Sequence, residues 1–171
     1  MCPEADHLVR RMTLGDLERV LDWRNHPDVR RYMFSAGPIT LGEHAAWYQK
    51  ASVDEHRHLL IFESNSVPLG YINIHCVSDG GIAEWGFYAA PDAPRGTGLK
   101  MTNAALDYAF NQAKLHKVCG KVLAYNDRSI RLHLNLGFAK EGVLRQQHFD
   151  GERYCDVVSF GLLSSERSPQ A

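Results

Sequence analysis

Residues 91–100 read Pro-Asp-Ala-Pro-Arg-Gly-Thr-Gly-Leu-Lys and separate an apolar stretch, 82–89, from a long amphipathic segment. The apolar stretch is typical of a strand. The segment that follows predicts a helix, because its apolar and small residues recur at helical spacing: Leu99, Thr102, Ala105, Leu106, Ala109, Phe110 and Ala113. A glycine-containing turn between a strand and a helix directs backbone N–H groups and the positive end of the helix dipole at one spot. The stretch therefore predicts a site for an anion such as a diphosphate.

Two familiar phosphate-binding motifs do not fit this stretch. A dinucleotide fingerprint, G-x-G-x-x-G, would need a third glycine where Met101 stands, and no acidic residue follows at the ribose spacing. A Walker loop would need Gly-Lys-Ser/Thr, which the sequence lacks. An ordinary turn that contains two glycines is the alternative interpretation.

Strand and helix patterns on either side of this stretch predict the rest of the fold. Strands are expected at 7–12, 58–63, 69–76, 82–89 and 117–124, followed by a hairpin with a two-residue turn at Asp150-Gly151. Helices are expected from Thr13 to about Asn25, from Pro27 to Met33, from the capping box at Thr40 to about Ala51, after residue 98, and over 127–136. This order indicates an α/β fold with a mixed, mostly antiparallel seven-stranded twisted sheet flanked by helices.

Composition narrows the class of protein. The 171 residues predict one domain, 1–163, with a flexible tail at 164–171. Lys plus Arg is 19 and Asp plus Glu is 20, which argues against a nucleic-acid partner. No apolar run reaches the ~18 residues of a membrane span, and the start lacks a signal-peptide pattern, so we expect a cytoplasmic protein without membrane contact.

Cysteine and histidine spacing gives no sign of a metal site or of disulfides. The four cysteines, Cys2, Cys76, Cys119 and Cys155, form no C-x-x-C pair, which favours reduced thiols. The close pair His56 and His58 lacks a third ligand nearby. We therefore expect no metal.

Two motifs, in this order along the chain, resemble those of the GCN5-related N-acetyltransferase (GNAT) family. Its acetyl-CoA loop, Gln/Arg-x-x-Gly-x-Gly/Ala, is matched by Arg95 and Gly98, with Lys100 in place of the last small residue. Its asparagine before a helix that ends in Gly-Phe is matched by Asn126 and Gly137-Phe138. The resemblance covers nearly the whole chain. It implies the GNAT fold, acetyl-CoA as acyl donor, and direct attack by a primary amine in a ternary complex. The implied cofactor contacts are Tyr88, Ala89, Ala90, Arg95, Gly96, Thr97, Gly98, Leu99, Lys100, Asn126 and Ser129.

Two side chains are candidate catalytic groups. In this family a tyrosine on the last helix often protonates the CoA thiolate, and its position here is His133, whose imidazole can donate a proton near neutrality. Glu84 lies on the predicted strand 82–89 and is the candidate base, acting through a water. Asn73 and His75 on the neighbouring strand are reserve candidates for positioning that water. A partly exposed histidine and a salt-bridged glutamate are the alternatives.

The N-terminal third is predicted to bind the acceptor. Arginines suit a diphosphate or a carboxylate, and Met, Phe and Trp side chains can enclose a flat ring. The candidates are Arg24, Arg30, Met33, Phe34, His44 and Trp47, the last two on one helix face. A core role for some of the aromatic and methionine side chains is the alternative.

Three stretches resemble one subgroup, the N-acetyltransferases of pseudaminic acid biosynthesis: residues 23–25, 43–47 and 141–145. That resemblance implies a nucleotide-sugar partner, the 4-amino group of a UDP-linked 4-amino-4,6-dideoxy sugar, in nonulosonate biosynthesis and flagellin glycosylation. The arginine-rich stretch argues against a polyamine. A ribosomal or other protein N-terminus stays an alternative, as does a non-catalytic acyl-CoA-binding domain. Exposed apolar strand edges near the hairpin are compatible with a homodimer.

Overall fold

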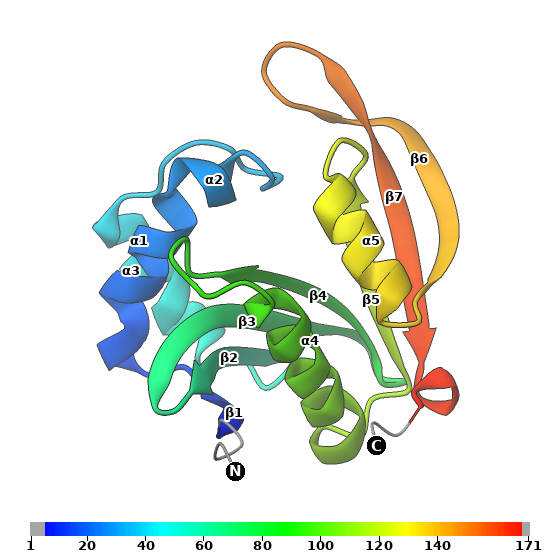
Figure 1. Ribbon diagram of the computed structural model, residues 1–171. Helices are drawn as coiled ribbons and strands as arrows, with labels where there is room; N and C mark the ends of the chain where they lie inside the picture. The colour runs from blue at the N-terminus through cyan, green and yellow to red at the C-terminus, as the bar shows by residue number, and fades with distance from the viewer. Residues whose placement is uncertain (1–5, 169–171) are drawn as a thin grey trace.

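A seven-stranded sheet with the strand order β1-β2-β3-β4-β5-β7-β6 organises the chain (Figure 1). The structure is a computed structural model that describes residues 6–168. The strands are β1 (His7–Arg11), β2 (Arg57–Ser64), β3 (Val67–Ser78), β4 (Ile82–Ala89), β5 (Lys117–Leu123), β6 (Ala139–Phe149) and β7 (Tyr154–Leu163). Neighbouring strands are antiparallel except β4 and β5, which are parallel. The predicted mixed, mostly antiparallel sheet is confirmed.

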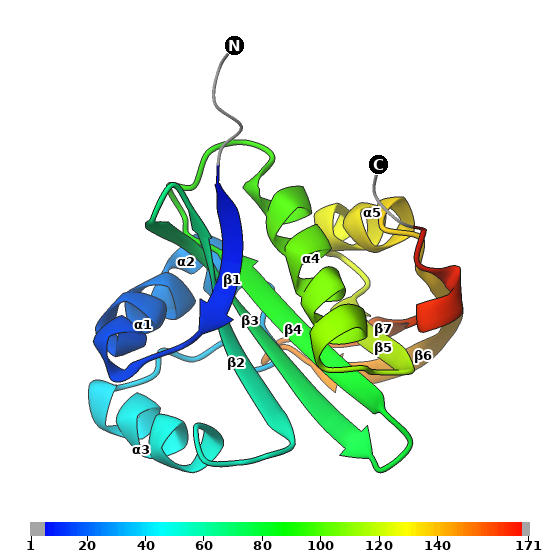
Figure 2. The ribbon, with the colours of Figure 1, turned by 90° about the horizontal axis from the view of Figure 1, so that it is seen from below.

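Helices cover both faces of this sheet. They are α1 (Leu17–Asn25), α2 (Pro27–Arg30), α3 (Leu41–Ala51), α4 (Thr97–Asp107) and α5 (Asp127–Asn135), with short 3-10 turns at Leu14–Asp16 and Ser164–Glu166 and a π-helical turn at Tyr108–Gln112. Seen from below, α1 and α3 lie on one side of β2 to β4, and α4 lies on the other (Figure 2).

Side chains of the central strands point alternately to the two faces of the sheet and fill a hydrophobic core on each face. On β2, Leu60 and Phe62 pack with α4, whereas Leu59 and Ile61 pack toward α1 and α3. Successive side chains of a strand point to opposite faces, so a run of apolar residues is expected when both faces are covered. The sheet therefore lies between two helix layers, with β4 at its centre.

Two local predictions differ from the structure near the C-terminus. The β6–β7 loop spans four residues, 150–153, and not two, because the Asp150 carboxylate accepts hydrogen bonds from the N–H groups of Glu152 and Arg153 (both 2.9 Å) and so holds a wider turn. The tail expected to be flexible from residue 164 is ordered at its start, since Arg167 forms an ion pair with Asp107 of α4 (2.9 Å). Residues 169–171, like Cys2 at the other end, lie outside the described residues.

Smaller differences concern two helices. The predicted helical turn after Pro27 ends at Arg30 and does not reach Met33. Leu99, expected on the apolar face of α4, is 46% exposed. Within residues 6–168, no helix is both long enough and apolar enough to cross a membrane.

Candidate active site

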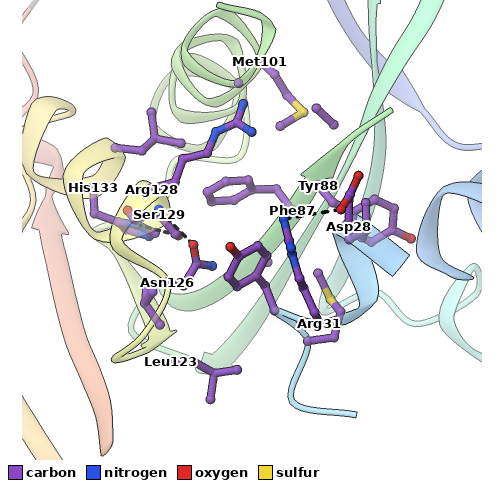
Figure 3. Close-up of a pocket in the computed structure, with 18 of the residues that line it drawn as sticks. Asp28, Arg31, Phe87, Tyr88, Met101, Leu123, Asn126, Arg128, Ser129 and His133 are labelled. Carbon is purple, nitrogen blue, oxygen red and sulfur yellow. Dashed lines mark hydrogen bonds and ion pairs between the residues drawn. The ribbon is translucent and has the colours of Figure 1, made fainter. Parts of the chain in front are cut away.

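The two parallel strands β4 and β5 separate partway along their length. They pair at three positions, from Ile82 with Lys117 to Glu84 with Cys119, and then diverge. A cavity of about 660 Å³ opens in this fork, lined by both strands, the starts of α4 and α5, and the segment around α2 (Figure 3). Tyr88, Ala89 and Ala90, which the sequence predicted to contact the cofactor, line this cavity. Main-chain groups of a strand that has lost its neighbour can bind an extended ligand in the manner of an added strand.

The start of α4 supplies an anion site at one end of this cavity. Gly96, the residue before the helix, has a φ of 91°, in the left-handed region that favours glycine. Gly98 lines the cavity, and a Cβ added there would meet no atom within 4 Å. First-turn N–H groups have no partner inside their helix, so they face this open space together with the helix dipole. A diphosphate fits this place.

The other predicted residues of this turn contribute differently. Thr97 lines the cavity, but its hydroxyl donates to the Pro94 carbonyl (2.7 Å) and so holds the turn. Arg95, Leu99 and Lys100 are exposed and lie outside the cavity lining. Direct contact between their side chains and the part of a cofactor inside the cavity is therefore not supported.

Residues at the start of α5 form the opposite wall. The Asn126 side chain accepts a hydrogen bond from the Ser129 N–H (3.2 Å), which caps the helix, and both residues line the cavity (Figure 3). Arg128 also lines it, although the sequence patterns did not single it out. The sequence did hold a signal for Arg128, because it lies in the first turn of the helix that follows the predicted cofactor residue Asn126.

His133 belongs to the protein core. It is 2% exposed, and its ring is packed among the rings of Trp85, Phe138 and Phe160. Its Nδ1 lies 2.8 Å from the Ser129 carbonyl, which can only accept, so Nδ1 carries the proton. Its Nε2 accepts from the Trp85 indole N–H (3.1 Å).

This environment does not fit the general acid that the sequence predicted. Burial lowers the pKa of His133, so the ring is neutral near pH 7. Both ring nitrogens are already engaged, although the ring borders the cavity. The prediction that His133 is the general acid is therefore wrong, because its side chain lacks both the charge and a free N–H. We assign it a structural role.

Glu84 lies at the point where the strands begin to separate. Its carboxylate accepts a hydrogen bond from the Lys121 ammonium (2.7 Å), and both side chains line the cavity while remaining about half exposed. On β3, His75 stands opposite Glu84, and Asn73 stands opposite Gly86. Neither lines the cavity, and the buried Oδ1 of Asn73 has no hydrogen-bond partner among the described residues. Glu84 therefore stays the candidate base, and the roles of Asn73 and His75 stay predictions.

Only part of the predicted acceptor set reaches the cavity. Met33 and Phe34 line it, whereas Arg30, Arg24, His44 and Trp47 do not. The guanidinium of Arg24 is buried and donates to the Ser35 carbonyl. His44 is buried too, donates to the Leu17 carbonyl (3.0 Å) and stacks on Trp47. The predicted contact of Arg24 and His44 with an acceptor is therefore wrong, because both side chains are buried and bonded to main-chain carbonyls outside the cavity lining.

Neighbouring residues take the places that those side chains were expected to fill. Asp28, Arg31 and Tyr32 line the cavity beside Met33 and Phe34. Arg31 forms an ion pair with Asp28 (3.4 Å), and its guanidinium lies 4.9 Å from the centre of the Tyr32 ring (Figure 3). The sequence indicated an arginine-rich wall without showing which arginines face inward. Among residues 6–168, no group of three or more His, Cys, Asp or Glu side chains could hold a metal ion.

Three histidines predict a pH-dependent stability: His44 and His133 are buried, and His58 is half-buried. Burial lowers the pKa values of His44, His58 and His133, so the unfolded chain binds more protons than the folded protein below about pH 6.5. The free energy of unfolding is therefore expected to fall from pH 7 to pH 5, by up to about 1.4 kcal/mol per pH unit for each histidine. The hydrogen bond to Arg10 lowers the pKa of Asp16 to about 2, so the contribution of Asp16 to stability is lost only at more acidic pH.

Urea unfolding at pH 5, 6 and 7 measures this dependence. His133→Phe should reduce the slope, and the control His116→Phe, at an exposed histidine, should leave it unchanged. A free energy of unfolding that is flat or rises toward pH 5 would contradict the assignment of these histidines as neutral in the folded protein.

Comparisons with known proteins identify the family of the chain. The family model described as "Acetyltransferase (GNAT) domain" matches residues 7–139. Acetyltransferase PseH of Campylobacter jejuni is 27% identical over 121 residues, 69% of this chain and 73% of that protein. A spermidine N(1)-acetyltransferase of Vibrio cholerae is 27% identical over 163 residues, 92% of this chain and 93% of that protein.

A solved structure extends the likeness to three dimensions. The crystal structure of spermidine N-acetyltransferase from Vibrio cholerae in complex with CoA and spermine superposes with a TM-score of 0.87 at 26% identity, covering 94% of this chain and 96% of that one. The cavity, the α4 cradle and the Asn126 cap described above fit a CoA thioester. The chain belongs to the GNAT family and is an acetyl-CoA-dependent amine N-acetyltransferase.

Proposed function

We propose that the acceptor is the 4-amino group of a UDP-linked 4-amino-4,6-dideoxy sugar of pseudaminic acid biosynthesis. The observation that carries this proposal is the charge of the cavity. Its two carboxylates, Asp28 and Glu84, each lie in an ion pair, with Arg31 (3.4 Å) and Lys121 (2.7 Å) respectively. Arg128, at the start of α5 on the cofactor side, has no ion-pair partner among the described residues and gives the cavity as a whole one more cation than carboxylates. A polycation needs uncompensated carboxylates, whereas a diphosphate is attracted to a site with surplus cations.

The apolar part of the same wall supports a nucleoside. Tyr32, Met33 and Phe34 line the cavity next to Arg31. A flat base can stack on aromatic rings, and a guanidinium can lie over such a stack or bind a phosphate. One segment of four residues, 31–34, therefore offers both kinds of contact that a UDP group requires.

The proposed reaction uses the fork between β4 and β5. The amine enters from the Glu84 side, attacks the thioester carbonyl, and forms the amide bond as the C–S bond to CoA breaks. Glu84 takes the amine proton through a water, and Lys121 holds the carboxylate at the fork. We assign no protein acid to the CoA thiolate, because thiols have a pKa of about 8.5 and the thiolate can take a proton from water.

Initial rates of thiol release from acetyl-CoA test the proposal with three acceptors measured separately: the UDP-4-amino sugar, spermidine, and a peptide with a free N-terminus. The kcat/KM for the sugar is expected to exceed the other two by about 100-fold, equivalent to about 2.7 kcal/mol. Thiol release that only the peptide or only spermidine stimulates would contradict the proposal. Release that no amine stimulates would favour a non-catalytic acyl-CoA-binding domain.

A charge reversal in the cavity wall makes the test specific to the site. Arg31→Glu should lower kcat/KM for the sugar at least about tenfold and raise it for spermidine, because the wall then carries surplus carboxylates. Arg30→Glu is the matched control, since the neighbouring arginine lies outside the cavity lining. Equal effects of the two variants would show that the net charge of the protein matters and the position of Arg31 in the cavity wall does not.

A further inference from the structure

One hydrogen bond joins the cofactor side of the cavity to its acceptor side. Tyr125 lies between β5 and α5, and its hydroxyl donates to the main-chain carbonyl of Arg31 (3.1 Å), 94 positions away in the sequence. The rings of Tyr125 and Tyr32 lie 6.2 Å apart. α2, which immediately precedes this part of the chain, faces α5 across the open side of the fork (Figure 1).

The segment held by Tyr125 continues α2 as a series of turns, in which the N–H groups of residues 31–33 donate to α2 carbonyls (3.0–3.2 Å). Residues 31–34 follow the end of α2 at Arg30, and the next helix, α3, begins at Leu41. The base of this connection is fixed elsewhere: Asn25 exchanges two hydrogen bonds with the main chain of Ile39 (2.7 and 2.9 Å). Tyr125 binds the start of the connection, at Arg31, where Arg31 and Tyr32 line the cavity.

A second contact from the same side supports the segment. The ring of Phe34 meets the ring of His148 on β6 edge-on, with centroids 5.4 Å apart. Aromatic contacts of this kind are weak, about 0.5–1.5 kcal/mol, and leave the direction of a main-chain carbonyl free. The hydrogen bond from Tyr125 is therefore the polar contact that ties the main chain of Arg31 to the α5 side of the cavity.

Tyr125 directly precedes Asn126, the residue that caps α5. Asn126 bonds to the Ser129 N–H, and both line the cavity beside the β4–β5 fork. A ligand that packs against Asn126 and Ser129 therefore restrains the backbone that carries Tyr125. Partial burial raises the pKa of Tyr125, so its hydroxyl keeps its proton and donates throughout the neutral pH range.

We propose that Tyr125 is a positioning residue for the acceptor, which couples occupation of the cofactor site to the placement of Arg31 and Tyr32. The proposal rests on the acceptor site assigned under Proposed function. Coupling between two sites is reciprocal, so bound cofactor should improve acceptor binding by the same factor as acceptor improves cofactor binding.

Hydrogen exchange tests the coupling without any acceptor. CoA is added to the wild-type protein and to Tyr125→Phe, which removes the hydroxyl and keeps the ring. In the wild type, saturating CoA is expected to slow amide exchange in residues 31–35; in Tyr125→Phe, this protection should be lost even when CoA is saturating. Tyr154→Phe is the control, at a tyrosine that is 66% exposed. No CoA-dependent protection in the wild type, or equal protection in Tyr125→Phe, would overturn the proposal.

Kinetics supply the second readout. With the acceptor that gives the highest kcat/KM in the thiol-release panel, Tyr125→Phe should raise the acceptor KM about three- to tenfold, the loss expected for one hydrogen bond, at nearly constant kcat. Because the coupling is reciprocal, the acetyl-CoA KM measured at saturating acceptor should rise by a similar factor. A lower kcat with an unchanged acceptor KM would overturn the positioning role. If the best acceptor is not the sugar, the proposed substrate fails, and the hydrogen-exchange result still decides the role of Tyr125.

Discussion

Replacing Gly98 with Glu is expected to raise the Kd for acetyl-CoA at least about 100-fold without loss of the fold. The position lies in the first turn of α4, lines the cavity, and has no atom within 4 Å of an added Cβ. A carboxylate there fills the anion cradle and repels a diphosphate, removing hydrogen bonds to a charged group that contribute about 1.5–3 kcal/mol each. The same carboxylate suits the positive end of the helix, so stability should hold or rise slightly. Titration calorimetry and thermal melting measure the two effects.

Gly42 provides the matched control for this variant. It occupies the same second position of its helix, α3, and a Cβ added there also meets no atom within 4 Å. Gly42→Glu should therefore leave acetyl-CoA binding unchanged. Comparable weakening by both variants, or wild-type affinity in Gly98→Glu, would remove the α4 cradle from the cofactor site.

Replacing Gly120 with Ala is expected to destabilise the protein by about 3 kcal/mol, a drop in Tm of about 6–12 °C for a chain of this size. The added Cβ would lie 2.5 Å from the His133 Nε2 and 3.0 Å from the Trp85 Nε1. Both rings are buried, so they cannot move aside without disturbing their mutual hydrogen bond. Urea unfolding followed by tryptophan fluorescence measures the loss.

Gly142→Ala on β6 is the control, since its Cβ meets nothing within 4 Å and should change stability little. A Gly120→Ala protein as stable as the wild type would mean that the Trp85–His133 pair does not pack as described. The structural role of His133, and with it the correction of its catalytic role, would then need revision.

The sequence predicted the strands, turns and helices that form the site better than it predicted which side chains are buried. The turn at 91–100 and the asparagine at 126 are local signals, since each depends on a strand followed by a helix, and both lie where expected. The order of strands and helices likewise follows from local patterns. These features could be predicted because neighbouring residues determine them.

Burial and contacts between distant segments could not be predicted in this way. Arg24 and Arg31 are both arginines in one stretch, yet Arg24 is covered by the connection to α3 while Arg31 faces the cavity. His133 occupies the position of a family acid, but the indole of Trp85, 48 positions earlier, engages its free nitrogen. Tyr125 meets Arg31 from the far end of the chain. Such contacts depend on the tertiary fold, which single-sequence spacing does not contain.

The central claim is that the fork between β4 and β5 is where acetyl transfer takes place. A crystal structure of the protein with bound CoA tests it most directly. We predict the diphosphate at the N-terminus of α4 beside Gly98, the pantetheine arm along Tyr88 to Ala90, and the thiol in the fork near Glu84. A CoA thiol bound outside this cavity, or a diphosphate away from α4, would contradict this claim.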